Sequence, residues 1–315
     1  MSTAHLYIFS DACPSDWLVD GHDNVWHTIV NVGFQSAPRL QDQIESGASP
    51  NAVLEQDPQW VEMIEALRSG LPFGELKKWK TSPRYKARFC SSFTATWPSH
   101  RPLVSACSFQ EKTLRECESV LLKAYNEHIG GLEGRGIGFE SFDDQKGRRC
   151  IRHSYVDMSG LHEIIGRENK MLVLLFLAWF VADQHAFHRQ EVVDSGKHGF
   201  DRLALTVVSD ILSEDNDSSR KGEALLRWLI DPEAREIPIV LTRSPQSDSF
   251  SGDLLADNLA GWLTAAISEP TGEFGILARD AAPSGVWAGW HVLKSSTGTL
   301  ESTAAVDRLL EPGEV

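Results

Sequence analysis

The sequence is poor in cysteine, and its few cysteines do not have the spacing of a structural site. It has five, an odd number, and no two of them form a C-x-x-C pair. A disulfide framework and a four-ligand zinc site are therefore not expected. Reduced thiols are typical of cytoplasmic proteins, and we predict a cytoplasmic location.

Basic residues are also scarce relative to acidic ones. The chain has 30 Lys and Arg against 44 Asp and Glu, a formal net charge of −14. This balance argues against broad, non-specific binding to nucleic acid, which requires many cations against phosphates. It does not exclude a nuclease, because metal ions bound by carboxylates supply positive charge locally.

Long apolar runs are missing too. The most apolar segment, residues 171–182, is about a dozen residues long, whereas a membrane span needs roughly 20. We expect a buried helix there and no membrane partner. No secretory signal is visible after Met1, and no G-x-S-x-G motif marks a serine nucleophile.

Two β-prone runs that end in Ser-Asp are the most informative feature present. They read L-Y-I-F-S-D at 6–11 and L-T-V-V-S-D at 205–210. Such runs predict buried strands, so Asp11 and Asp210 would lie where apolar packing gives way to solvent. A third carboxylate, Asp257, lies in the helical segment A-D-N-L-A-G at 256–261.

The order of predicted elements indicates a mixed sheet. Five strands are predicted, at 6–10, 26–34, 104–109, 202–208 and 237–241. Loops separate the first three, which favours an antiparallel meander, whereas the later strands alternate with helices, which favours parallel crossovers. We predict an α/β fold with a mixed five-stranded sheet flanked by helices.

One domain is expected to contain this sheet. It would extend over 1–295, with an inserted helical and loop segment at about 36–100 and a flexible tail at 296–315. The insertion has one clear helix, which begins near Asp57 and Pro58 and ends at Gly70.

The motifs resemble a family of RNase H-like proteins that carry a domain of unknown function. Members typically open with a strand ending D-E-S-G and close with a helix carrying A-D-x-x-A-G. The closing motif is present at 256–261, and Asp210 and Asp11 match the acids of the fourth and first strands. The opening motif differs, since D-A-C-P at 11–14 places Ala12 where the family has an acid.

This resemblance implies a metal site. In an RNase H-like fold Asp11 and Asp210 would lie side by side, with Asp257 over the same sheet edge, and Glu111 is one candidate for a fourth ligand. Asp183 and Asp253 are others. Hard oxygen ligands suit Mg²⁺ or Mn²⁺, and two such ions can promote phosphodiester cleavage.

We therefore expect a metal-dependent nuclease or phosphodiesterase with Asp11, Asp210 and Asp257 as catalytic residues. The alternative is a catalytically degenerate RNase H-like interaction protein or a subunit of a larger complex, because Ala12 replaces an acid. A protein partner or a homo-oligomer is compatible with either hypothesis.

One basic cluster stands out in this acidic chain, and the aromatic residues Trp79 and Tyr85 are interleaved with it. Its members are Lys77, Lys78, Lys80, Arg84, Lys86 and Arg88. Two interpretations remain open: a solvated surface, or a patch that contacts the phosphates of a nucleic acid while aromatic rings stack on bases.

Overall fold

The structure is a computed structural model, and it describes part of the chain. The described residues are 3–13, 23–36, 50–113, 116, 137–143, 149–156, 202–209, 239–243, 250–296 and 299–310. The chain divides into two compact units, which are described separately. The first unit comprises Met1–Ile8, Phe34–Asp57 and Leu121–Ser244, and the second comprises Phe9–Gly33, Pro58–Val120 and Pro245–Val315.

A mixed five-stranded sheet is the centre of the second unit. Its strands, in order across the sheet, are β1 (Thr3–Cys13), β2 (Trp26–Ser36), β3 (Leu103–Gln110), β8 (Gly289–Ser296) and β9 (Thr299–Ala304). β2 pairs antiparallel with β3, β3 pairs parallel with β8, and β8 pairs antiparallel with β9. The prediction of an α/β fold with a mixed five-stranded sheet is thus confirmed, although β8 and β9 were not among the predicted strands.

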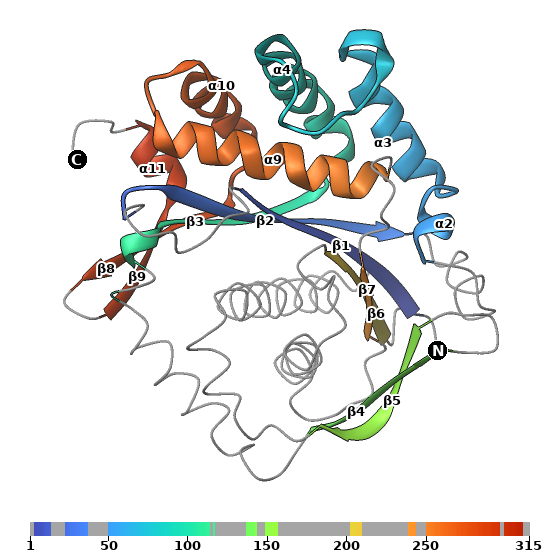
Figure 1. The fold of residues 1–315 in the computed structure, drawn as a ribbon. Helices are drawn as coiled ribbons and strands as arrows, with labels where there is room; N and C mark the ends of the chain where they lie inside the picture. The colour runs from blue at the N-terminus through green and yellow to red at the C-terminus, as the bar shows by residue number, and fades with distance from the viewer. Residues whose placement is uncertain are drawn as a thin grey trace. The chain divides into compact units, whose positions relative to one another are not determined.

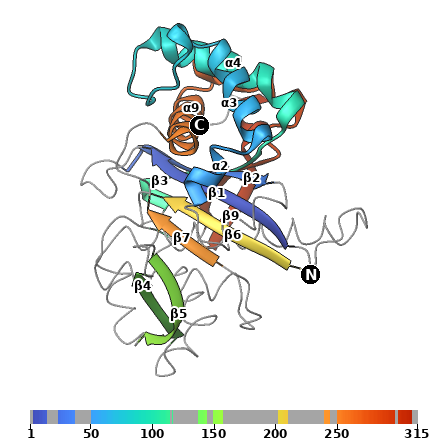
Figure 2. The ribbon, with the colours of Figure 1, turned by 90° about the vertical axis from the view of Figure 1, so that its right-hand side faces the viewer.

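The two later predicted strands belong to the first unit. They are β6 (Arg202–Ser209) and β7 (Ile239–Arg243), and they pair in parallel as predicted. The strand order in this unit is β7, β6 and then β1. The unit also contains the short helix α2 (Pro50–Leu54) and an antiparallel pair, β4 (Ile137–Asp143) and β5 (Arg149–Val156). Figure 2 shows both strand pairs.

Helices cover the sheet of the second unit. They are α3 (Pro58–Ser69), α4 (Pro83–His100), α9 (Ser251–Ser268), α10 (Glu273–Ala281) and α11 (Ala305–Leu310), with short 3₁₀ turns η1 (Pro72–Gly74) and η3 (Ala282–Ser284). In Figure 1, α9 runs along the sheet, and α3, α4 and α10 lie beyond it. None of the helices in the described part of the chain is long and apolar enough to cross a membrane.

α9 approaches the sheet closely because its first turn contains Gly252. A Cβ atom there would lie 2.4 Å from the Phe9 ring of β1, which is far inside van der Waals contact. The helix can therefore lie directly on the strand that carries Asp11.

Local sequence signals explain the two longer helices of the predicted insertion. α3 begins at Pro58, as predicted, and buries Trp60, Ile64 and Leu67 on one face. α4 was not predicted; the Ser82 hydroxyl accepts the Tyr85 N–H at its start, and Pro83 occupies its first turn. From residue 50 to residue 100 the insertion is therefore mostly helical.

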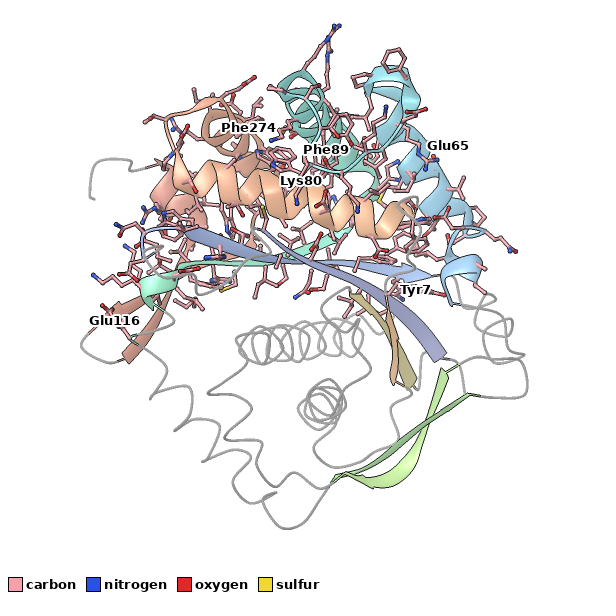
Figure 3. All side chains as sticks on the ribbon, viewed as in Figure 1. Tyr7, Glu65, Lys80, Phe89, Glu116 and Phe274 are labelled. Atoms are coloured by element: carbon pink, nitrogen blue, oxygen red, sulfur yellow. The ribbon has the colours of Figure 1, made fainter. Side chains whose placement is uncertain are left out.

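Aromatic side chains fill the space among these helices and the sheet. Trp262 of α9 meets Trp287 edge to face at a centroid distance of 5.0 Å, and Trp287 meets Trp290 in the same way at 6.0 Å. Phe89 and Phe274, labelled in Figure 3, lie in the same helical layer. Trp287 and Trp290 are buried, so packing is their role.

The structure differs from the prediction of a flexible tail at 296–315. Residues 299–304 form β9, which pairs antiparallel with β8, and residues 305–310 form α11. The segment T-L-E-S-T-A has little apolar periodicity, so its strand depends on the partner strand rather than on its own pattern.

Candidate functional site

Asp11 lies near the end of β1, where the strand passes beneath α9. Its side chain is half-buried, and Oδ1 accepts the N–H of Ala12 at 2.7 Å. Two residues later, the Cys13 carbonyl accepts a hydrogen bond from the Thr264 hydroxyl of α9 at 3.0 Å. This contact fixes the end of the strand against the helix that carries Asp257.

Asp11 and Asp257 both act electrostatically on the Cys13 thiol. Burial is the main cause of its raised pKa, and the carboxylates of Asp257 and Asp11 both raise the pKa further. A hydrogen bond from Thr264 and the charge of Lys80 act in the opposite direction. Two of the three predicted catalytic carboxylates are therefore close enough to act on the same thiol.

Asp257 is half-buried and surrounded by cations. Burial raises the pKa of its carboxyl group, while the Trp79 N–H and the charges of Lys78, Lys80 and Lys86 lower it. The Trp79 N–H donates to Asp257 Oδ2 at 2.6 Å. The predicted basic cluster thus lies beside the predicted carboxylate, although Trp79 and Asp257 are 178 positions apart in the sequence.

The closing motif at 256–261 holds the segment that contains these lysines. Asn258 Nδ2 donates to the Lys77 carbonyl and to the Leu254 carbonyl, both at 2.6 Å. At Gly261 a Cβ atom would lie 2.1 Å from the Trp79 ring, so only glycine leaves room for this indole. Asp257, Asn258 and Gly261 together fix the main chain from Lys77 to Trp79.

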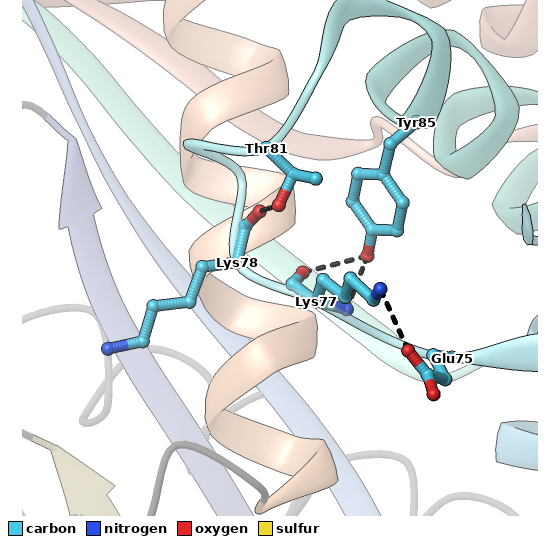
Figure 4. Close-up of polar contacts among 5 residues, drawn as sticks. All are labelled: Glu75, Lys77, Lys78, Thr81 and Tyr85. Atoms are coloured by element: carbon cyan, nitrogen blue, oxygen red, sulfur yellow. Dashed lines mark hydrogen bonds and ion pairs between the residues drawn. The ribbon is translucent and has the colours of Figure 1, made fainter.

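Tyr85 of α4 holds the same segment from the other side. Its hydroxyl donates to the Lys77 carbonyl and accepts the Lys77 N–H, each at 2.7 Å (Figure 4). Burial raises the pKa of this hydroxyl. Trp79 and Tyr85 are only 7% and 3% exposed, so neither ring is available to stack on a base.

The side chains of the basic cluster, in contrast, reach solvent. Lys78, Lys80, Arg84 and Arg88 are exposed, and Lys86 Nζ lies 4.9 Å above the centre of the Trp79 ring. A main chain held by these hydrogen bonds therefore presents cations around a half-buried carboxylate, which is an arrangement suited to an anionic ligand.

Glu111, the fourth predicted ligand, has a different environment. It follows β3, is completely buried, and its Oε1 lies 3.1 Å from Nε2 of His27 on the neighbouring strand. Its N–H donates to the Val25 carbonyl at 3.2 Å. The pair with His27 is a role that the sequence did not suggest.

The metal site remains a prediction. Asp210 and Asp183 lie outside the described residues. Within the ranges that the structure describes, no three His, Cys, Asp or Glu side chains lie close enough together to hold a metal ion. Asp11 and Asp257 nevertheless provide hard carboxylate oxygens of the kind that Mg²⁺ or Mn²⁺ prefers, and a cation would offset the cost of burying the charge of Asp257.

Thr264 and Asn258 are site residues that the sequence did not reveal. Asn258 lies inside the predicted motif, but its partner is the Lys77 carbonyl, 181 positions away.

Comparison of the chain with protein-family models, with curated proteins and with solved structures gave no match.

Proposed function

We propose that this chain is a metal-dependent nuclease or phosphodiesterase with an RNase H-like fold. The observation that carries the proposal is that Asp257 of α9 lies among Lys78, Lys80 and Lys86, while Thr264 of the same helix donates to the Cys13 carbonyl, two residues after Asp11. Carboxylates that bind cations, next to lysines that bind phosphate, match the needs of phosphodiester cleavage.

The strand orders support the RNase H-like part of the proposal. β7, β6 and β1 are consecutive neighbours in the first unit, and β1, β2 and β3 are consecutive neighbours in the second. An RNase H-like sheet places its first strand between the meander and the later parallel strands, and both orders are compatible with that plan. The antiparallel pairing of β2 with β3 and the parallel pairing of β6 with β7 fit as well.

In this proposal Asp11, Asp210 and Asp257 hold Mg²⁺ or Mn²⁺, with Glu111 as the fourth candidate. When bound, such ions activate water and stabilise the leaving oxygen. The Trp79 N–H orients the Asp257 carboxylate. Lys80 and Lys86, which act electrostatically on Asp257, would hold the phosphate against these ligands.

A cleavage assay tests the proposal. Labelled single- and double-stranded DNA and RNA are incubated with Mg²⁺, Mn²⁺ or EDTA, and wild type is compared with Asp11→Asn, Asp257→Asn and the control Asp280→Asn, which changes an exposed acid of α10. We expect metal-dependent cleavage that falls on the order of 100-fold in the first two variants and is unchanged in the control. Equal cleavage by all four proteins would reject the site.

The second candidate is a catalytically degenerate interaction protein. It is favoured by the structural task of Asp257, which binds the Trp79 main chain, and by Ala12 in place of an acid. This alternative predicts no change in melting temperature when Mn²⁺ is added. A melting shift that disappears in Asp11→Asn would argue against it.

A further inference from the structure

Phe73 is an aromatic side chain that the fold exposes at a cost. Its side chain is 91% exposed, although burial of an aromatic ring is favourable. Its backbone has φ 61° and ψ 11°, the left-handed region that glycine adopts readily and an aromatic residue rarely does. Packing among the residues that the structure describes explains neither feature, so we looked for a ligand that the exposed ring could bind.

The turn that carries Phe73 is firmly held. Pro72 fixes the approach, Gly74 follows at φ 66°, and the Gly74 N–H donates to the Leu71 carbonyl at 3.2 Å. Leu71 and Leu76, on either side, are buried. The ring is therefore presented by an anchored turn rather than by a loose loop.

One cation lies at this ring, and others follow it along the chain. Lys77 Nζ lies 5.8 Å from the ring centre, and Lys78, Lys80 and Arg84 are exposed within the next few residues. From Leu76 to Gln110 the sequence contains seven Lys and Arg but no Asp or Glu, in a chain whose net charge is −14. We call Phe73 and the cations that follow it in the sequence the Phe73 patch; these cations are Lys77, Lys78, Lys80, Arg84 and Lys86.

We propose that the Phe73 patch binds single-stranded nucleic acid, with an unpaired base stacked on Phe73 and the backbone phosphates on the neighbouring lysines. A stacked base requires an unpaired strand, and aromatic rings combined with cations are the usual means of binding one. The inference rests on the proposed function for its substrate class and adds that the substrate is single-stranded.

The net charge of the chain, −14, favours an anionic ligand that contacts few residues. A duplex or an anionic membrane presents its phosphates over a wider area than an unpaired strand of a few nucleotides does. The main chain of Lys77 and Trp79 is already fixed by Tyr85, Asn258 and Asp257, so little ordering is required on binding.

Glu75 partly neutralises the positive charge of Lys77 in the Phe73 patch. Its Oε2 lies 2.8 Å from Lys77 Nζ, and Lys77 lowers the pKa of this carboxyl group. A phosphate at Lys77 must compete with Glu75, so Glu75→Gln should tighten binding.

The test is fluorescence anisotropy in EDTA, which prevents metal-dependent cleavage. The probes are a labelled oligo-dT 12-mer, a duplex of the same length and phosphatidylserine vesicles. We expect the 12-mer to bind more tightly than the duplex, and Phe73→Ala to weaken 12-mer binding roughly 5- to 100-fold. Phe73→Trp should retain binding. Leu310→Ala, which truncates an exposed apolar residue of α11, should have no effect.

Salt dependence gives a second measurement. Each phosphate contact removed by Lys78→Ala or Lys80→Ala should reduce the slope of log K against log salt by about 0.7. The inference is overturned if Phe73→Ala binds the 12-mer as tightly as wild type does, or if the duplex binds at least as tightly as the 12-mer. It is also overturned if wild type binds the vesicles more tightly than the 12-mer and this binding is lost in Phe73→Ala. Phe73-dependent binding without metal-dependent cleavage supports this inference while rejecting the proposed function.

Discussion

The main-chain N–H of Trp79 donates a 2.6 Å hydrogen bond to Oδ2 of Asp257. This bond joins the basic cluster to the carboxylate of the closing motif. Asp257 therefore combines a structural contact with its proposed role in metal binding, and experiments must separate the two. Substitutions at position 257 that keep or remove the oxygen that accepts the Trp79 N–H separate the structural role from the metal-binding role.

Asp257→Asn keeps an acceptor for the Trp79 N–H and removes the charge, whereas Asp257→Ala removes both. Leaving this N–H without its partner costs roughly 1–3 kcal/mol. We expect Asp257→Ala to be less stable than Asp257→Asn by about this amount in urea denaturation, while both lose activity. Equal stability of the two variants would show that the bond is unimportant.

The pH dependence of stability should also differ between wild type and Asp257→Asn. Burial raises the pKa of the Asp257 carboxyl group above its ordinary value of 3.8, so the folded chain binds this proton more tightly than the unfolded chain does. The resulting stabilisation is present below that value and is lost as the pH rises through the raised pKa. Denaturation of both proteins at several pH values from about 4 to 7 should show wild type losing stability relative to Asp257→Asn, and a constant difference would contradict the assignment.

Gly261→Ala should be destabilising, contrary to the usual effect of this change in a helix. Alanine in a helix interior is normally better than glycine by about 1 kcal/mol, but here the added Cβ would collide with the Trp79 ring. We expect a loss of roughly 1–3 kcal/mol, measured by denaturation. In a Trp79→Ala background the same substitution should be tolerated, and an unchanged cost there would contradict the contact.

Tyr85→Phe removes one hydroxyl that serves both the N–H and the carbonyl of Lys77. The Lys77 carbonyl keeps its bond from Asn258, but the N–H loses the phenolic acceptor. We expect a stability loss of roughly 1–3 kcal/mol and weaker oligonucleotide binding, because the lysines are no longer presented by a fixed main chain. Unchanged binding would show that the clamp does not matter for the Phe73 patch.

Phe73→Asn should stabilise the chain while abolishing base stacking. Asparagine tolerates the left-handed backbone, so the substitution should raise the free energy of unfolding by up to roughly 1 kcal/mol, and almost no burial is lost. Leu310→Asn, at an exposed helical position, lacks this relief and serves as control. A destabilised Phe73→Asn protein would indicate an unrecognised packing role for the ring.

The sequence predicted the strands that have strong apolar patterns and missed those that depend on partners. β1, β2 and β3 appear as buried runs, and every residue from Trp26 to Phe34 is in fact buried. β8 and β9 carry Lys294, Glu301 and several serines and threonines, and their alternation is too weak to recognise without the neighbouring strand. α4 had a visible signal in Ser82 and Pro83, together with the four-residue spacing of Phe89, Phe93 and Trp97.

The candidate site was predictable as a set of residues but not as an arrangement. Asp11, Asp257 and the basic cluster were identified from local motifs. No local pattern indicates that Asn258 binds the Lys77 carbonyl, or that Gly261 accommodates the Trp79 ring, because these contacts depend on the packing of segments about 180 positions apart. One of the two interpretations of the basic cluster used Trp79 and Tyr85 as stacking rings, but both are buried and the exposed ring belongs to Phe73.

The close approach of Gly261 to the Trp79 ring has a consequence for the evolution of such chains. The glycine is required only while a large planar side chain occupies position 79, so the two positions should change together in diverging sequences. A chain with a small residue at 79 would be free to place alanine or serine at 261. A chain that retains A-D-x-x-A-G would then be expected to retain the segment with Trp79 and its neighbouring lysines as well. This expectation holds whether or not Asp257 still binds a cation.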